Sequence, residues 1–78
     1  MPLRYTLRQL EYFVAVGETG SIAAASQQVN VSSPSISAGV SQLEEELGVK
    51  LFVRYHAQGL TPTLAGRKLL DHAQMVLR

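Results

Sequence analysis

The sequence predicts a mainly α-helical domain that carries one short β-hairpin before its last helix. Three observations lead to this prediction. Apolar residues recur at helical spacing in four separate stretches of the chain. Threonine, serine, asparagine and glycine residues with capping character lie before and between the first three stretches. A weakly alternating segment with β-branched and aromatic residues precedes the fourth.

Length and composition indicate a single folded domain. The chain has 78 residues, of which 46% are hydrophobic and 17% charged, a balance that argues against disorder. It has no cysteine, no apolar run long enough to cross a membrane and no segment of signal-peptide type, so we expect a cytoplasmic protein. The net charge of +1 is low for a nucleic-acid-binding protein; if DNA is the partner, the seven basic residues must gather on one face.

The first predicted helix begins after Thr6, because Gln9 lies three residues later and completes a capping box. Tyr5 is placed to pack on Leu10 as a hydrophobic staple. One apolar stripe runs along the helix, but Tyr12 and Val16 lie on a different face. We therefore expect this helix to contact two surfaces.

The second predicted helix is short and has clear ends. Ser21 is placed to cap it, and its sequence is IAAASQQV. Asn30 suits a left-handed end, and Val31 is placed to pack back on the helix.

The third predicted helix lies in the segment NVSSPSISAGVSQLEEELG, whose first half is rich in serine. Ile36, Val40, Leu43 and Leu47 recur at helical spacing, which a flexible serine linker would not show. Either Ser32 or Ser33 supplies the cap, and Pro34 suits the first turn. The prediction is a helix over about 33–47 that ends at Gly48, with close packing of another element against Gly39.

The face of this helix opposite the apolar stripe is small and uncharged. It consists of Pro34, Ser37, Ala38 and Ser41, flanked by Ser35 and Gln42. Two interpretations stay open at this point: an ordinary solvated helix face, or a surface whose hydroxyl groups contact a partner.

The rest of the chain predicts a hairpin and a last helix. Strands are expected near 51–54 and 59–61, followed by a helix over 63–78. The cap of that helix is either Thr63, or Thr61 with Pro62 in the first helical position. Its apolar face, which includes Leu69, Ala73, Val76 and Leu77, is too wide for a helix that packs on one side alone.

The order of these elements is that of a winged helix-turn-helix domain. We expect the domain over 1–62, with the helix-turn-helix at about 22–41 and the wing at about 51–61, and a linker or dimerisation helix over 63–78. In such domains the second helix of the pair lies in the DNA major groove with its N-terminal residues at base edges. Small side chains and hydroxyl groups on the third helix suit that position.

The residues also resemble a known family. LRQLEYFVAVGETGSIAAASQQVNVSSPSISAGVSQLEEELGVKLFVR, followed by LAGRKLLDHA, resembles the N-terminal DNA-binding domain of LysR-type transcriptional regulators. The resemblance implies promoter binding as a homodimer paired through the last helix, with Arg54 where the wing meets the DNA backbone. It also implies tetramers as a possible form of the full-length regulator. The family's effector-binding domain is absent from this sequence, so no small-molecule effector is expected here.

The departures from the family pattern concern charge. The family often has glutamine at the position of Ser33 and basic residues at Ala38, Ser41 or Gln42. A bidentate arginine–guanine contact, worth about 1–3 kcal/mol of discrimination, is therefore not expected. Hydroxyl contacts, apolar contacts to thymine methyl groups and DNA shape should carry more of the specificity.

The predicted sites are a DNA surface and a dimer surface. The DNA surface comprises Ser32, Ser33, Pro34, Ser35, Ser37, Ala38, Ser41, Gln42, Arg54 and His56. The dimer surface comprises Tyr12, Val16, Leu69, Ala73, Val76 and Leu77.

Other classes of function have weaker support in the sequence. His56, Asp71 and His72 do not have the spacing of a metal site, and no catalytic set or phosphate-binding loop is present, so neither an enzyme nor a cofactor is expected. The main alternative is a winged-helix protein-interaction module that does not bind DNA.

Overall fold

The computed structural model describes residues 6–54 and 59–77 and confirms the predicted fold class. Its elements are α1 (Leu7–Thr19), α2 (Ile22–Val29), α3 (Ser33–Leu47), β1 (Phe52–Arg54), β2 (Leu60–Pro62) and α4 (Leu64–Leu77). The predicted strands lie within a residue of those observed. Tyr5 and His56 lie outside the described residues.

The helix ends follow the local capping chemistry of the sequence. The predicted capping box of Thr6 and Gln9 is present at the start of α1. Ser21 caps α2, and Asn30 ends it in the left-handed conformation with φ of 61°. Ser32 is the cap of α3, which settles the choice between the two serines.

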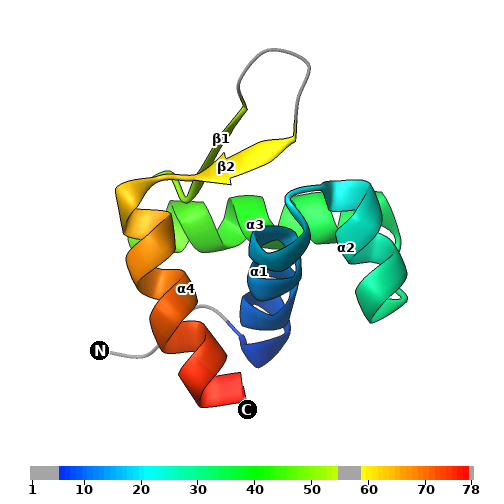
Figure 1. The fold of residues 1–78 in the computed structure, drawn as a ribbon, viewed down its shortest axis with the longest axis horizontal. Helices are drawn as coiled ribbons and strands as arrows, with labels where there is room; N and C mark the ends of the chain where they lie inside the picture. The colour runs from blue at the N-terminus through cyan, green and yellow to red at the C-terminus, as the bar shows by residue number, and fades with distance from the viewer. Residues whose placement is uncertain (1–5, 55–58, 78) are drawn as a thin grey trace.

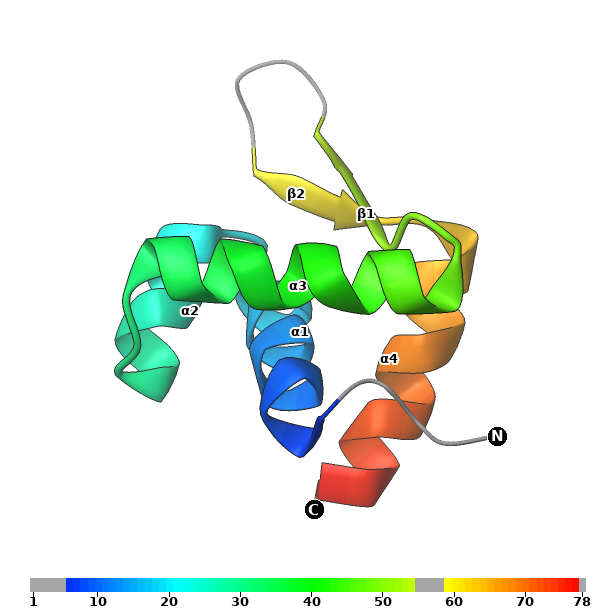
Figure 2. The same ribbon diagram turned by 180° about the vertical axis from the view of Figure 1, so that it is seen from behind.

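The elements surround α1. α3 lies across one side of α1, α2 and α4 flank it, and the hairpin stands above α3 (Figures 1 and 2). The fully buried side chains include Phe13 and Val16 of α1, Ile36 and Leu43 of α3, and Leu51. Because these residues come from separate segments, the core forms only when the segments come together.

The contact between α1 and α3 depends on a glycine. A Cβ atom on Gly39 would lie 2.7 Å from Cδ2 of Tyr12, so the Tyr12 ring lies directly over this glycine. The predicted close packing at Gly39 is confirmed, and it occupies the Tyr12 side chain within the protomer.

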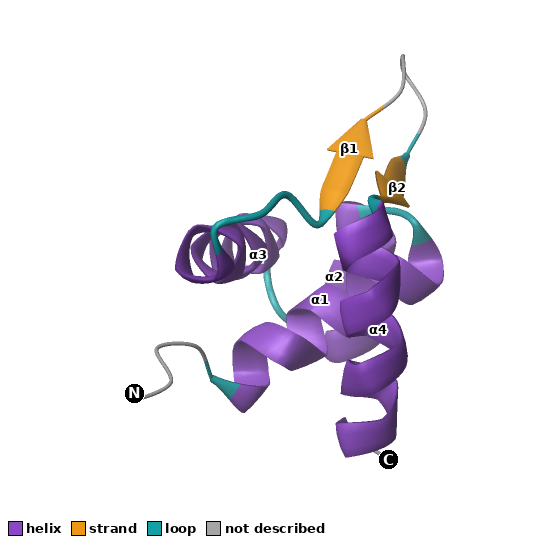
Figure 3. Cartoon of the chain, turned by 90° about the vertical axis from the view of Figure 1, so that its left-hand side faces the viewer, coloured by secondary structure: helices purple, strands orange, loops and turns teal. Residues whose placement is uncertain are grey.

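The hairpin is antiparallel, and a backbone hydrogen bond joins it to the helices. Phe52 pairs with Pro62 and Arg54 with Leu60. The backbone N–H of Leu60 donates to the carbonyl of Gly20 at 2.9 Å, which joins the hairpin to the turn between α1 and α2. The hairpin thus projects from the helices while its second strand stays bonded to the turn between α1 and α2 (Figure 3).

Thr63 joins the hairpin to α4. Its hydroxyl group accepts from the backbone N–H of Gly66 at 3.0 Å and donates to the carbonyl of Lys50 at 2.7 Å. Thr63 is therefore the cap of the last helix. The alternative cap through Pro62 is wrong, because Pro62 lies in β2.

Glu44 fastens α3 to the start of β1. One oxygen of its carboxylate accepts from the backbone N–H groups of Leu51, at 2.7 Å, and Phe52, at 3.3 Å. Its other oxygen lies 4.0 Å from the Lys50 ammonium group. The neighbouring Glu45 and Glu46 are exposed, but Glu44 points back onto the protein.

We expect Glu44→Ala to lower the free energy of unfolding by about 1–3 kcal/mol, because two largely enclosed backbone N–H groups would lose their acceptor. Denaturant unfolding measures the change. Glu45→Ala, on the exposed side of the same helix, is the matched control and should stay within about 0.5 kcal/mol of the wild type. Equal effects of the two substitutions would contradict this role of Glu44.

We also expect Gly66→Ala to lower the free energy of unfolding by about 2–3 kcal/mol, because a Cβ atom there would overlap the backbone carbonyl of Leu51. Gly17→Ala is the control. Its Cβ atom would meet only the side chain of Leu70, whose methyl groups lie nearest and can rotate away, and alanine favours a helix by about 1 kcal/mol over glycine. Thermal unfolding should show a large loss for the first variant and little for the second.

Candidate nucleic-acid interface

The outer face of α3 is the largest group of predicted site residues that the structure brings together. Figure 2 shows α3 in front of the other helices. Its inner side buries Ile36, Gly39, Val40 and Leu43. Of the predicted contacts on this helix and its cap, Ser33 is half-buried, and the others are exposed: Ser32, Pro34, Ser35, Ser37, Ala38, Ser41 and Gln42.

The hydroxyl groups at the start of α3 are not equivalent. Ser32 accepts from the backbone N–H of Ser35 at 3.4 Å, and its hydroxyl donates to the Ser35 hydroxyl at 2.9 Å. Ser37 and Ser41 form no side-chain hydrogen bond with residues 6–54 or 59–77. Ser37 and Ser41 can thus direct both the donor and the acceptor of their hydroxyl groups outward.

A hollow separates α3 from the hairpin. It has a volume of about 170 Å³, and its lining includes Ser37, Ser41, Glu44 and Arg54. The structure therefore places Arg54, which is exposed on β1, at the same concave surface as the serines of α3.

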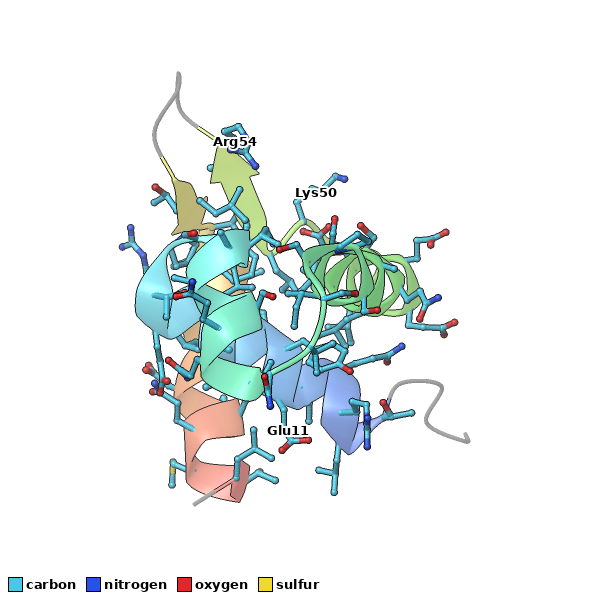
Figure 4. All side chains as sticks on the ribbon, turned by 90° about the vertical axis from the view of Figure 1, so that its right-hand side faces the viewer. Glu11, Lys50 and Arg54 are labelled. Carbon is cyan, nitrogen blue, oxygen red and sulfur yellow. The ribbon has the colours of Figure 1, made fainter. Side chains whose placement is uncertain are left out.

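Two basic residues, Lys50 and Arg54, lie near this surface (Figure 4). Lys50 and Arg54 project beside α3 and the hairpin, whereas Glu11 lies far from both (Figure 4). Positive charge thus flanks a neutral helix face. His56, the remaining predicted contact, lies outside the described residues.

Gln42 is exposed, and its side chain is hydrogen-bonded to a residue of α1. Its side-chain oxygen accepts a hydrogen bond from the Gln9 side chain at 2.9 Å. Gln9 was predicted only as part of the α1 cap; its second role joins residues of two helices that no local pattern connects.

The predicted dimer surface needs correction at three positions. Tyr12 is half-buried and packs on Gly39 of α3. Val16 is fully buried and Ala73 is 2% exposed, because both pack into the protomer's own core. Leu69 and Leu77 are half-buried against that core. Val76 is 65% exposed.

Two exposed apolar residues of α4 were missed. Leu64 is 70% and Met75 75% exposed. They are eleven residues apart, which is about three helical turns, so they share one side of the helix. This spacing was the signal in the sequence that could have identified them.

A second, wider hollow lies at the end of α3. It has a volume of about 440 Å³, is open to solvent, and is lined by residues that include Ser41, Glu45, Val49 and Lys50.

Within the described part of the chain, no three histidine, aspartate or glutamate side chains gather as a metal site. None of the helices described here has the length and apolarity needed to cross a membrane.

The chain is similar to known regulators over nearly all its length. It is 41% identical to the HTH-type transcriptional regulator YvbU of Bacillus subtilis over 94% of this chain and 25% of that protein. It is thus about a quarter as long as this relative.

Two solved structures of DNA complexes have the same fold. The DNA-binding domain of CbnR bound to DNA matches 92% of this chain and 82% of that one, with 43% identity and a TM-score of 0.86. The DNA-binding domain of BenM bound to benA site 1 DNA matches 92% of this chain and 80% of that one, with 35% identity and a TM-score of 0.86.

The family model of bacterial regulatory helix-turn-helix proteins of the LysR family matches residues 7–67. These residues run from the first residue of α1 into α4 and include the whole outer face of α3. The chain belongs to the LysR family of bacterial helix-turn-helix regulatory proteins.

Proposed function

We propose that this chain binds double-stranded DNA in a sequence-specific manner, as the promoter-recognition domain of a LysR-type transcriptional regulator. In this proposal residues 1–62 form the DNA-binding domain and 63–78 the linker helix. The observation that carries it is the exposed, small and uncharged outer face of α3, with Arg54 at the edge of the adjoining hollow.

The shape of this face supports entry into the major groove. That groove admits an α-helix, and side chains as small as those of Ser37 and Ala38 let the backbone come near the base edges. The CbnR and BenM domains that share the fold were solved in complex with DNA. By this likeness α3 would lie in the groove and the hairpin against the backbone or minor groove.

The distribution of charge supports the same orientation. The exposed carboxylates of Glu45 and Glu46 lie in the C-terminal half of α3 and would repel phosphates. The N-terminal half carries no charged side chain. We infer that the N-terminal half enters the groove, while Lys50 and Arg54 contact the backbone beside it.

The proposal places the protein with the bacterial chromosome in the cytoplasm and gives it a binding role without catalysis. A protein-interaction module without DNA binding is the other candidate, which the exposed Leu64, Met75 and Val76 would favour. Self-association through α4 accounts for the same exposed residues. A mobility shift on duplex DNA at low salt distinguishes the two functions.

Arg54 and Ser37 should have different effects on binding. Arg54→Ala should weaken binding to cognate and random duplexes by similar factors, because phosphate contacts carry no sequence information. It should also lower the slope of log affinity against log salt by about 0.9 per subunit.

Ser37→Val is the companion variant. It should leave the salt slope and random binding unchanged but weaken cognate binding by about 1 kcal/mol, through a lost base-edge contact. Titrations of both duplexes at several salt concentrations measure these quantities. If Ser37→Val weakens both duplexes equally, or neither, α3 is not the element that distinguishes sequences.

We further propose that two copies of the chain pair through the exposed side of α4. Val76 lies at the centre of this proposal, with the exposed parts of Leu69 and Leu77 beside it and Leu64 and Met75 as additional apolar residues. In a symmetric pair each such patch covers its counterpart on the other copy. A promoter with two half-sites would then bind the pair more tightly than one copy.

Val76→Asp should shift sedimentation toward the monomer and weaken binding to a duplex with two half-sites, because it places a charge in an apolar contact. Gln27→Asp adds the same charge at an exposed position of α2 and should leave the pair intact. An unchanged dimer in Val76→Asp would exclude this surface.

A further inference from the structure

The capping box of α1 fixes the orientation of one side-chain amide. The backbone N–H of Thr6 donates to Oε1 of Gln9 at 3.0 Å, and the backbone N–H of Gln9 donates to Oγ1 of Thr6 at 3.1 Å. A backbone N–H can only donate, so the oxygen of the Gln9 amide must face Thr6. Its NH₂ group must therefore point the other way.

That NH₂ group meets Gln42 of α3. Nε2 of Gln9 lies 2.9 Å from Oε1 of Gln42. Because the Gln9 NH₂ group is also only a donor, Gln42 must turn its oxygen toward α1. The two amides thus form a series of hydrogen bonds that begins at the cap of α1 and ends at the Gln42 NH₂ group. In this series the orientation of each amide fixes that of the next.

The Gln42 NH₂ group, at which this series of hydrogen bonds ends, lies at the edge of the outer face of α3. Gln42 is exposed and follows Ser41, one helical turn after Ala38. An unrestrained glutamine pairs with adenine through both amide atoms, its oxygen accepting from N6 and its nitrogen donating to N7. The hydrogen bond from Gln9 turns the Gln42 oxygen toward α1. That oxygen keeps a second lone pair, but in this orientation the NH₂ group is the part of the amide directed away from α1, so Gln42 acts mainly as a donor.

We propose that Gln9 is a positioning residue for DNA recognition, which makes Gln42 a hydrogen-bond donor toward acceptor atoms in the major groove. This inference rests on the proposed function. Guanine presents two acceptors there, O6 and N7, whereas cytosine presents the N4 donor. The expected preference at the base pair that Gln42 contacts is therefore guanine over adenine or cytosine.

The variant Gln9→Glu should reverse the orientation of the Gln42 amide without removing the cap of α1. A glutamate at this position still accepts from the Thr6 N–H, as in the common form of the capping box. Its second oxygen is also an acceptor, so Gln42 must now turn its NH₂ group toward α1 and its oxygen toward the groove. Selection of bound duplexes from a randomised pool, followed by sequencing, should then show a change from guanine to adenine or cytosine at one base pair.

The size of the change follows from one hydrogen bond. A net contribution of about 0.5–1.5 kcal/mol corresponds to roughly two- to twelvefold in relative affinity. Gln42→Ala should reduce the preference at the same base pair by a similar factor. A purely structural role of Gln9 would alter affinity for all sequences and would not exchange one base for another.

Arg8→Gln is the matched control. It changes the net charge by the same amount at the neighbouring, exposed position and leaves both amides in place. It should shift overall affinity but retain the base preference. Thermal unfolding of each variant checks that α1 remains folded.

The outcomes separate this inference from the proposed function. If Gln42→Ala removes a base preference that Gln9→Glu leaves unchanged, Gln9 does not position Gln42. If neither variant alters any preference while Ser37→Val does, α3 recognises DNA but this inference is wrong. If the wild-type chain selects no sequence from the pool, the proposed function and the inference both fail.

Discussion

The fold depends on the burial of α1 on several sides at once. Phe13 and Val16 are fully buried, and α2, α3, α4 and β2 all pack against this helix. The Phe13 ring also lies 5.3 Å from that of Phe52 in β1. A chain of 78 residues has too little apolar surface for two cores, so every element must contribute to the same one. The outer face of α3 is exposed because its other side completes this core.

Polar contacts determine how the hairpin stands on that core. A two-stranded hairpin is marginally stable by itself, and each strand here has three residues. Glu44 holds the start of β1, and the Gly20 carbonyl holds the start of β2. The hairpin is therefore held to α3 at the start of β1 and to the turn between α1 and α2 at the start of β2.

The sequence predicted what is local and missed what is not. The Thr6 and Ser21 caps, the inner stripe of α3 and the hairpin follow from spacings of a few residues and were predicted correctly, whereas the caps of α3 and α4 were each left between two alternatives. Helical spacing placed Val16 and Ala73 on apolar faces but could not tell whether the same chain or a second copy covers them. The bond between Gln9 and Gln42 spans 33 residues and leaves no periodic signal. Glu44, Glu45 and Glu46 look alike in the sequence, and only the folded chain brings the backbone N–H groups of Leu51 and Phe52 to Glu44.

The exposure of α3 also bears on how such a domain could acquire a new target. Pro34, Ser37, Ala38 and Ser41 are all exposed, so exchanging the last three changes folding stability little. A gene duplicate could therefore vary these positions while its product stays folded. Divergence of two copies toward separate operators would require few steps, and none of those steps needs a compensating change in the interior.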